Sequence, residues 1–517
     1  MDMPQDKTRQ AVSAAVIGNV LEWYDFAVYG YVATIIAKNF FPQGDPAIAL
    51  LATFAAFGIG FLARPLGGIV IGWVGDQYGR KTALLITIFL MALGTVIIGL
   101  IPTYATIGLL APTILVLARL MQGFSAGGEW GGSTAFIVEW APANRRGFYG
   151  SFQQMSVVAG LLLGSGIAAL LNTVLDGASM DSWGWRIPFL IGGILGPVGL
   201  WMRRTIDETP AYTAAKSEAA PAAPAQAAAE GTLDLGKLAR SLFFIGLFGI
   251  LFAMLWWAAF YFIAAKASFN DSVNCLLLTT SGCLQIKLSL PGALAYEPRL
   301  FGIALALTIV GFLVLNSLRR QETDPLILAT QAFGFTILWT VSFYIFLAYM
   351  PTFTQRYAGL SRAAALWSNT AGLLLLMLAI PYFGHLSDKY GRKPFLLACC
   401  LAFIVLPYPA FSIMVGGASL FTILLIQLLI GLTIALFSGA GPAAISEIFP
   451  TRTRSAYMST GYALAVAIFG GFAPFLATLL IEKTGSPISP VFYVITAAIV
   501  SASVIACLRE TAHKPLG

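Results

Sequence analysis

Long apolar runs separated by short polar loops make up most of the chain from residue 12 to residue 507. Each run has about 20 residues, which is enough to cross the hydrocarbon core of a bilayer as an α-helix. Apolar and polar positions do not alternate within the runs, so the pattern argues against a transmembrane β-barrel. The spans predicted in the first half cover residues 12–37, 48–74, 83–101, 107–135, 148–171 and 187–201. Those predicted in the second half cover residues 333–353, 364–383, 396–415, 420–443, 456–480 and 491–507.

Two further apolar runs, residues 242–265 and 300–315, lie between the halves, and Arg319 and Arg320 follow the second run. If both runs cross the membrane, the total is about 14 spans. The alternative is that one or both lie in the interface or re-enter. The predicted fold is therefore an all-α membrane protein with two six-helix bundles and two additional central helices. Its domains are an N-terminal bundle (1–204), a cytoplasmic Ala/Pro linker (205–239), the two extra helices with an external loop (240–320) and a C-terminal bundle (321–517).

The external loop between the extra runs contains a predicted β-hairpin. Apolar and β-prone residues flank a Thr-Thr-Ser-Gly turn, which ends at Gly282. Cys275 and Cys283 lie on either side of this turn and could form a disulfide in an oxidising compartment. The alternative is two free thiols.

The amino-acid composition indicates that the chain folds in lipid rather than in water. The 517 residues are 58% hydrophobic and 10% charged, and the mean hydropathy is +0.82, whereas a soluble domain carries about 25% charged residues. The chain is therefore expected to reside in a lipid bilayer. The net charge of +7 does not indicate nucleic-acid binding, because the basic residues lie in short loops, as the positive-inside rule expects. An even number of spans predicts that both termini are cytoplasmic.

The chain contains an internal duplication. The loop Gly72-Trp-Val-Gly-Asp76-Gln-Tyr-Gly79-Arg80-Lys81 returns 312 residues later as Gly384-His-Leu-Ser-Asp388-Lys-Tyr-Gly391-Arg392-Lys393. A second motif, running from Glu139 to Arg146, returns 308 residues later between Glu447 and Arg454. Two motifs repeated in the same order at nearly one offset indicate two copies of one bundle.

These loops resemble the loop signature of the major facilitator superfamily. Segments 18–26 (GNVLEWYDF), 63–68 (ARPLGG) and 119–129 (RLMQGFSAGGE) resemble its metabolite:proton symporter family. The resemblance covers most of residues 11–204 and, more loosely, residues 331–509. It implies a major facilitator fold, alternating access, proton-coupled symport, a bacterial inner-membrane location and a monomer. The proton gradient is then the energy source, and no other cofactor and no metal site is expected.

Asp76 and Asp388 each end a span, where the helix dipole disfavours a negative charge. The resemblance implies that each faces the start of a span in the opposite half: the span after Arg454 for Asp76, and the span after Arg146 for Asp388. Such a latch would close the cytoplasmic side, whereas the alternative is that these loops fix topology alone. The gating-loop candidates are Asp76, Gly79, Arg80, Asp388, Gly391 and Arg392.

Charged residues inside spans are costly and indicate function or a paired structural role. The first half contains such residues, but the centres of the matching second-half spans are nearly uncharged: position 427, the counterpart of Arg119, is Gln. Glu22 and Asp25 are three residues apart and are expected to share a helix face. Repulsion between close carboxylates and burial both favour the neutral form, which suits a proton carrier. The proton-coupling candidates are Glu22, Asp25, Arg119 and Glu129, and the alternative is a static ion-pair cluster.

Arg64 precedes Pro65 within a predicted span, and its guanidinium suits a substrate carboxylate. Alternatively, Arg64 pairs internally with Asp25 or Glu22. Other candidates for the cavity are polar or aromatic, although each could equally be a packing residue. The substrate-binding candidates are Arg64, Arg119, Tyr24, Tyr29, Gln122, Gln153, Trp339 and Gln427, with Gln154, Tyr344, Asn369 and Tyr462 as further possibilities.

The sequence favours a secondary transporter that takes up a small organic carboxylate together with protons. The alternatives are uptake of a zwitterionic osmolyte or an aromatic acid or lactone, and a transport-fold sensor that binds ligand without translocating it. The osmolyte branch of the resembled family carries a long charged tail, which is not expected after Glu510, and this favours a carboxylate. An enzyme is not expected, because the chain has two histidines and neither a metal-ligand cluster nor a nucleophile elbow. The sequence has no nucleotide-binding loop, which argues against ATP as the energy source.

Overall fold

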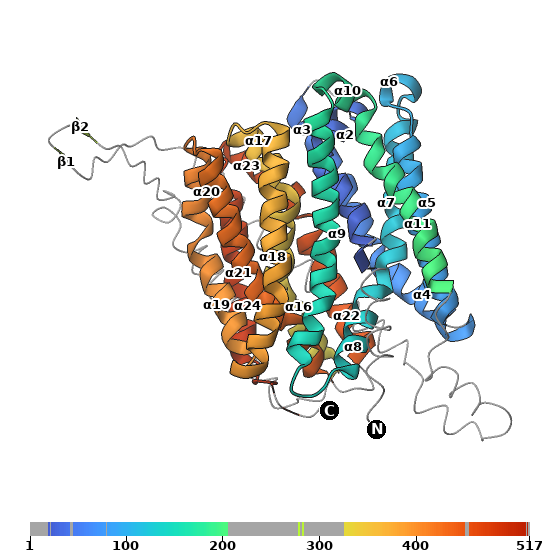
Figure 1. Cartoon of the computed structure of the whole chain (residues 1–517), viewed down its shortest axis with the longest axis vertical. Coiled ribbons are helices and arrows are strands. Elements are labelled where there is room, and N and C mark those ends of the chain that lie inside the picture. Colours follow the sequence, from blue (N-terminus) through green and yellow to red (C-terminus); the bar gives the residue numbers. More distant parts are fainter. Residues whose placement is uncertain are drawn as a thin grey trace.

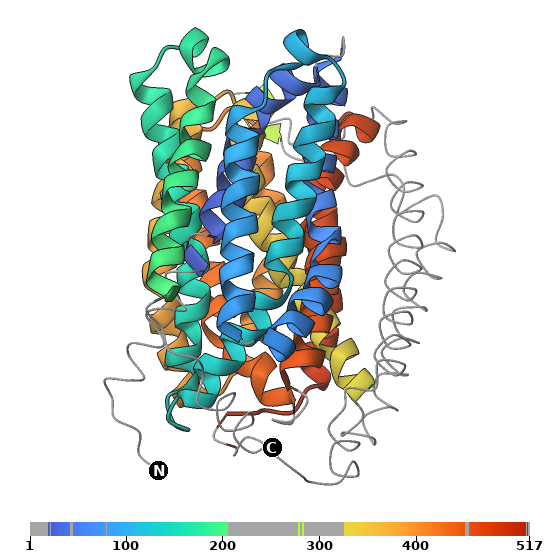
Figure 2. The same ribbon diagram turned by 90° about the vertical axis from the view of Figure 1, so that its right-hand side faces the viewer.

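The computed structural model describes residues 19–20, 22–41, 45–78, 80–204, 278–279, 282–283, 325–449, 454–512 and 514. The predicted linker 205–239 and the two predicted extra spans, 242–265 and 300–315, lie outside these residues, so the total of about 14 spans stays a prediction. We call residues 19–204 the first half and residues 325–514 the second half. Figures 1 and 2 show the helices of both halves running side by side in one bundle.

The first half is helical nearly throughout, with residues 22–31 leading into the first labelled helix. Its elements are α2 (Ala33–Phe40), α3 (Pro46–Leu62), α4 (Arg64–Tyr78), α5 (Arg80–Leu100), α6 (Tyr104–Ile107), α7 (Leu110–Ser125), η1 (Ala126–Gly128), α8 (Glu129–Trp140), α9 (Arg146–Val174), α10 (Gly177–Ser182), η2 (Gly184–Arg186) and α11 (Ile187–Arg204).

The second half repeats this arrangement. Its elements are α16 (Pro325–Phe343), the π-helix η3 (Tyr344–Tyr349), α17 (Met350–Tyr357), α18 (Arg362–Tyr390), α19 (Lys393–Val405), α20 (Pro407–Val415), α21 (Leu420–Ile448), α22 (Arg454–Ala465), the π-helix η4 (Val466–Gly470), α23 (Ala473–Thr484) and α24 (Pro490–Cys507).

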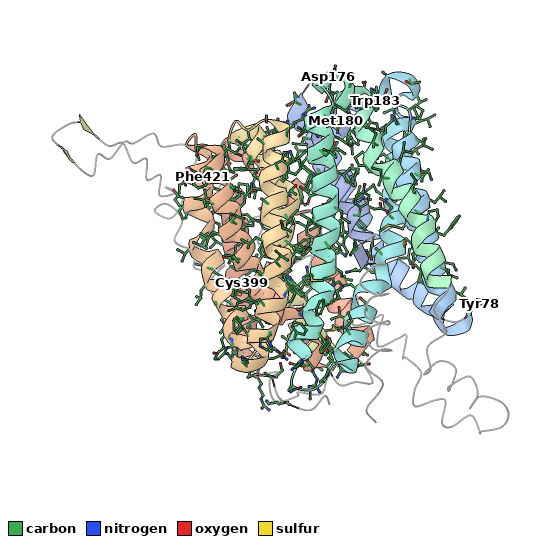
Figure 3. All side chains as sticks on the ribbon, in the orientation of Figure 1. Tyr78, Asp176, Met180, Trp183, Cys399 and Phe421 are labelled. Carbon is green, nitrogen blue, oxygen red and sulfur yellow. The ribbon has the colours of Figure 1, made fainter. Side chains whose placement is uncertain are left out.

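Length and composition identify seven of the described helices as able to cross a membrane, or eight if the bent pair α19–α20 is one span. Large apolar side chains cover the outside of the bundle; Leu378 and Phe421 are 64% and 66% exposed. Phe421 points away from the neighbouring helices (Figure 3). Water would disfavour such a surface, but lipid chains suit it. The chain is therefore a multi-pass membrane protein.

Several predicted spans contain breaks that the apolar pattern does not reveal. The span predicted at 48–74 divides at Ala63 into α3 and α4, where Pro65 lacks the N–H that a continuous helix would use. The span predicted at 107–135 divides at the short 3₁₀ helix η1, which includes Gly127 and Gly128. Both breaks lie beside charged candidates, Arg64 and Glu129.

The predicted hairpin is present in backbone form. Strands β1 (Leu278–Thr279) and β2 (Gly282–Cys283) pair antiparallel, with Leu278 opposite Cys283. Cys275 and the side chain of Cys283 lie outside the described residues, so the disulfide stays a prediction.

Small residues let the halves approach closely. Helices α9 and α18 lie side by side along their length (Figure 1). A Cβ added at Gly384 would lie 2.6 Å from the carbonyl oxygen of Gly147. Within the first half, a Cβ at Gly160 would lie 2.5 Å from the carbonyl oxygen of Val20. Larger side chains at either glycine would therefore push these helices apart.

Candidate functional site

Arg64 is a buried cation at the start of α4, directly after the break in its span. It is 3% exposed, and its Nη2 lies 3.8 Å from Oε1 of Glu22, too far for a hydrogen bond. Its guanidinium carbon lies 4.5 Å from the ring centroid of Phe61 and 4.8 Å from that of Phe26. Among the described residues, Nε and Nη2 of Arg64 have no hydrogen-bond partner. Arg64 therefore has N–H groups available for an anionic ligand.

A continuous hydrogen-bonded chain connects Arg119 to Asp25. Nη1 of Arg119 donates to Oε1 of Gln122 at 2.9 Å, and Nε2 of Gln122 donates to Oγ1 of Thr95 at 2.8 Å. Thr95 lies 2.7 Å from Oδ2 of Asp25, to which its hydroxyl donates. All four side chains are at most 5% exposed. Helices α5 and α7 thus hold the Asp25 carboxylate and a cation in one buried network.

The ring of Phe26 contacts both buried cations, Arg64 and Arg119. Its ring centroid lies 4.8 Å from the guanidinium carbon of Arg64 and 5.0 Å from that of Arg119. Desolvated contacts of this kind are worth roughly 2 kcal/mol each. They stabilise two like charges in a small volume, in which Glu22 and Asp25 supply the balancing negative charges.

The carboxylates of Glu22 and Asp25 have different polar partners. Asp25 accepts from Thr95 and also approaches α11, where a Cβ at Gly192 would lie 2.4 Å from its Oδ1. Glu22 lies beside Arg64, with 3.8 Å between its Oε1 and Nη2 of Arg64. Each carboxylate thus has its own polar partner, Thr95 for Asp25 and Arg64 for Glu22, and the shared face stays a prediction. A separation of three residues turns an α-helix through about 300°, which leaves the two side chains about 60° apart.

Other predicted binding residues are divided between this cluster and separate places. The ring centroid of Tyr29 lies 4.4 Å from the guanidinium carbon of Arg119. Tyr24 lies elsewhere: its hydroxyl donates to the backbone carbonyl of Pro188 in α11. Gln427 faces a separate small pocket within the second half, together with Asn369. Gln153 and Gln154 are buried on α9. The side chain of Glu129 lies outside the described residues.

An aromatic group crosses between the halves next to the charged cluster. Trp130 of α8 stacks on Tyr462 of α22 with 3.5 Å between ring centroids and 4° between ring planes. Trp339 of α16 meets Trp130 edge-on at 5.8 Å, and its Nε1 donates to Oγ of Ser438. Tyr344 packs on Phe61 with 5.3 Å between centroids.

Sequence reasoning missed some of the residues that build this site. Thr95, Phe26, Phe61 and Trp130 were not among the candidates. Thr95 could have been noticed as a hydroxyl in an otherwise apolar run, and Trp130 as the residue after Glu129. Phe26 and Phe61 have no such signal, because aromatic residues are common throughout these spans.

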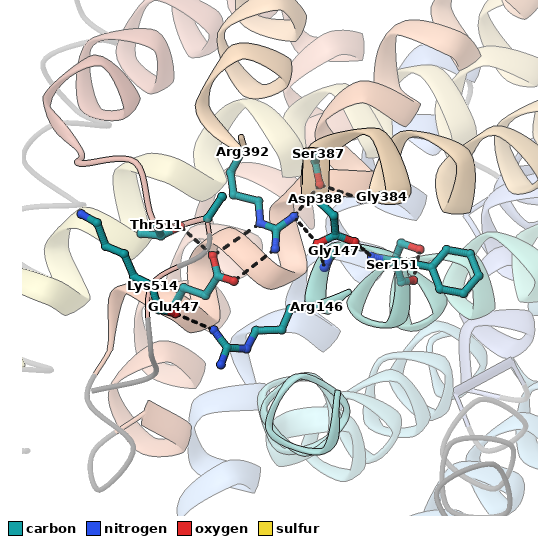
Figure 4. A network of polar contacts seen from close by, with 12 residues as sticks. Arg146, Gly147, Ser151, Gly384, Ser387, Asp388, Arg392, Glu447, Thr511 and Lys514 are labelled. Atoms are coloured by element: carbon teal, nitrogen blue, oxygen red, sulfur yellow. Dashed lines mark hydrogen bonds and ion pairs between the residues drawn. The ribbon is translucent and has the colours of Figure 1, made fainter. Parts of the chain in front are cut away.

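A polar network closes the predicted cytoplasmic end of the bundle (Figure 4). The Asp388 carboxylate accepts from the backbone N–H groups of Gly147 and Phe148, both at 2.8 Å, at the start of α9. This is the helix terminus that the resemblance implies for Asp388. Arg392 donates to Asp388 at 2.8 Å and pairs with Glu447 at 3.2 Å. Gly391 has φ +94, and a side chain there would meet Glu510.

The first-half copy of this loop is only partly described. The side chains of Asp76 and Arg80, and all of Gly79, lie outside the described residues. At the same end of the bundle, Nη1 of Arg454 in the second half lies 2.6 Å from Oε1 of Glu139 in the first half. The second motif therefore also connects the halves.

The opposite end of the bundle is closed as well. Asp181 of α10 pairs with Lys38 at 2.8 Å and with Arg362 of the second half. Partial burial raises the pKa of Asp181, but the hydrogen bonds from Lys38 and Arg362 more than offset this and hold the pKa below its ordinary value of 3.8. Figure 3 shows the neighbouring Asp176, Met180 and Trp183 at this end of the bundle. With contacts at both ends, the structure is an occluded conformation.

Comparison with known proteins identifies the family. The profile described as "Sugar (and other) transporter" matches residues 11–239, and the profile "Major Facilitator Superfamily" matches residues 332–517. The proline/betaine transporter of Escherichia coli K12 is 32% identical over 510 residues, which cover 99% of this chain and 85% of the relative. This chain belongs to the major facilitator superfamily.

Two further comparisons extend this picture. The citrate-proton symporter of Klebsiella pneumoniae is 31% identical over 489 residues, which cover 95% of this chain and 89% of that protein. The solved proton:xylose symporter XylE, bound to 6-bromo-6-deoxy-D-glucose, superimposes with a TM-score of 0.66 at 18% identity and covers 98% of this chain and 97% of that one. The second comparison shows the major facilitator fold. The predicted resemblance to the superfamily is thus confirmed, and its members are transporters rather than enzymes.

Proposed function

We propose that this major facilitator is a proton-coupled symporter that takes up a small zwitterionic osmolyte by alternating access. The observation that carries the proposal is the buried Arg64–Glu22 pair, which places opposite charges beside Phe61, a ring that packs on Tyr344 of the second half. Whole-length similarity to a proline/betaine transporter supports the same substrate class. This was the alternative expectation from sequence. The expected absence of a long tail favoured a carboxylate, but tail length says nothing about the binding cluster.

Charge balance in the cluster suggests how protons couple to substrate. Arg64, Arg119, Glu22 and Asp25 sum to zero when all are ionised. A proton on Asp25 removes one negative charge and leaves the cluster net positive. The carboxylate end of a zwitterionic substrate near Arg64 then offsets this positive charge locally, while its cationic end lies away from Arg64, so proton and substrate each favour binding of the other.

The contacts at the two ends supply the gates for alternating access. Opening towards the cytoplasm requires loss of the contacts of Asp388 and Arg454, and opening outwards requires loss of the Asp181–Arg362 pair. We place the protein in a bacterial inner membrane as a monomer, with both termini cytoplasmic and the proton gradient as its energy source.

A second candidate substrate is a small organic anion such as a di- or tricarboxylate. Arg64 and Arg119 each retain buried Nε and Nη2 groups without a hydrogen-bond partner among the described residues. Two guanidinium groups that contact the same Phe26 ring suit a ligand with more than one carboxylate. The citrate-proton symporter relative supports this alternative.

The deciding experiment uses purified protein in liposomes with an inward-directed proton gradient. Internal pH and uptake of labelled betaine, proline or citrate are followed in turn. We expect betaine or proline to enter together with protons, and Arg64→Gln to abolish both fluxes. Arg356→Gln, at an exposed position of α17, provides a control that also removes one arginine. Proton entry with citrate alone would replace the osmolyte by the anion. Binding without counterflow exchange would instead indicate a ligand sensor.

A further inference from the structure

Three aromatic residues from three different helices meet beside the charged cluster. Trp130, Trp339 and Tyr462 belong to α8, α16 and α22, and they are 5%, 3% and 9% exposed. The centroid of Trp339 lies 5.8 Å from that of Trp130 and 6.1 Å from that of Tyr462. Their planes are inclined to that of Trp339 by 75° and 72°. The stacked pair and the inclined Trp339 thus form two sides of a box.

The stacked pair joins residues from opposite halves. In the occluded conformation, Trp130 and Tyr462 cover one another's faces at 3.5 Å. Any separation of the halves at this point uncovers both faces. Two parallel π-faces that open towards each other attract a cation placed between them, because the ring quadrupole is negative at its face.

Buried polar groups around these rings remain unused. Nε1 of Trp130, the hydroxyl of Tyr344 and the Nε and Nη2 groups of Arg64 have no hydrogen-bond partner among the described residues. Buried polar groups are normally satisfied. Helix α22, which carries Tyr462, contacts α4, which begins at Arg64. Tyr344 packs on Phe61, whose ring centroid lies 4.5 Å from the guanidinium carbon of Arg64, so the aromatic box and the guanidinium belong to one neighbourhood. An occupant with an anionic end at Arg64 and a cationic end at the rings would use both features.

We infer that Trp130, Tyr462 and Trp339 form a binding site for the quaternary ammonium group of a betaine-type substrate. This inference rests on the proposed zwitterion symport and assigns its cationic end. A quaternary ammonium has no N–H to donate, so a carboxylate cannot bind it by a hydrogen bond, whereas ring faces bind it well. The substrate inserts between Trp130 and Tyr462 in place of their mutual stack, and its carboxylate lies towards Arg64 and Tyr344.

The test compares substrates that differ only in methylation of the nitrogen. Glycine, N-methylglycine, N,N-dimethylglycine and trimethylglycine share one carboxylate and compete for uptake into proteoliposomes. We expect the apparent KM to fall with methylation, with trimethylglycine about tenfold below dimethylglycine. Trp130→Leu and Tyr462→Leu should remove this preference, and Trp130→Phe should largely retain it. Trp183→Leu, an exposed tryptophan at the outer end, is the matched control.

A substitution that preserves ring shape keeps the test independent of folding. Fluorinated tryptophans at position 130 weaken the negative ring face without changing the packing, so trimethylglycine affinity should fall stepwise with the number of fluorines. An unchanged methylation preference in the Leu variants, with only a lower turnover, would assign the rings to gate packing and overturn the inference while leaving zwitterion transport intact. Failure of the wild-type protein to transport any zwitterion would overturn both.

Discussion

Arg454 reaches across the interface to Glu139, and the two side chains form an ion pair of 2.6 Å between the halves. The duplication relates Arg454 to Arg146 and Glu139 to Glu447, but the second pair is not formed in the same way. Nη1 of Arg146 donates to the carbonyl of Lys514, whereas Glu447 pairs with Arg392 of its own half. Two copies of one motif therefore close the predicted cytoplasmic end asymmetrically.

Replacing Glu139 should favour the inward-open conformation. The Arg454 side chain is fully buried and that of Glu139 is 38% exposed. Glu139→Gln therefore removes the counter-charge of a buried cation at a partly solvated site. We expect the closed state to lose about 1–2 kcal/mol, a shift of about 5- to 30-fold in the conformational equilibrium.

Spin labels at positions 78 and 390, which are exposed and lie on opposite halves, would report this shift as a longer interlabel distance. Glu482→Gln removes an exposed carboxylate on α23 and should leave the distances unchanged. Identical distance distributions for Glu139→Gln and the wild-type protein would rule out a role for this pair in closure.

Asp388→Asn should slow turnover with little effect on substrate affinity. The carboxylate accepts two backbone N–H groups of α9 and one from Arg392. An amide offers one acceptor oxygen and turns its own donor group towards these donors. Charge-assisted hydrogen bonds contribute about 1.5–3 kcal/mol each, so we expect kcat to fall at least about tenfold, with KM within about threefold. Lys389→Gln is the neighbouring control, and a change confined to KM would contradict the gating role.

The sequence predicts the described spans, because length and apolar pattern determine where helices lie, and the family resemblance of the repeated loop implies the Asp388 contact. It does not predict which neighbours Glu22 and Asp25 contact. Their separation of three residues indicates a shared face, yet an offset of about 60° is enough to place them beside different helices. The Trp130–Tyr462 stack could not be predicted either. It joins residues from different halves, depends on how the halves pack, and involves no charge that would mark it.

The outer ion pair should be insensitive to pH across the physiological range. Hydrogen bonds from Lys38 and Arg362 keep the pKa of Asp181 below 3.8. A depressed carboxylate pKa stabilises the closed outer end at every pH above its ordinary value, and this stabilisation is lost only as the pH falls through the lowered value. We therefore expect no outer opening between about pH 5 and pH 8 from this group.

Asp181→Asn should instead open the outer end at neutral pH. A partly buried pair of this kind contributes about 1 kcal/mol, so the outward-open population should rise about fivefold. Spin labels at Leu109 and Leu420, exposed at the outer end of the two halves, measure the opening. Lys483→Gln removes an exposed charge on α23 and serves as the control. Outer opening of the wild-type protein near pH 6 would show that another group controls this gate.

Asp25→Asn should separate substrate exchange from proton movement. Asp25 is 5% exposed and ends the hydrogen-bonded chain that begins at Arg119. Asparagine is neutral at every pH, so the cluster in this variant always has the net charge that it has in the wild-type protein when Asp25 is protonated. Coupling one proton to one substrate allows about tenfold accumulation per unit of pH gradient, whereas the variant should reach only about onefold. Counterflow of labelled for unlabelled substrate should persist, because the gates and Arg64 are intact.

Thr95→Val removes the connecting hydroxyl but keeps both charges, so it should slow transport without abolishing accumulation. Proton entry with substrate in Asp25→Asn at the wild-type ratio would assign the carried proton to another residue, with Glu22 the next to test.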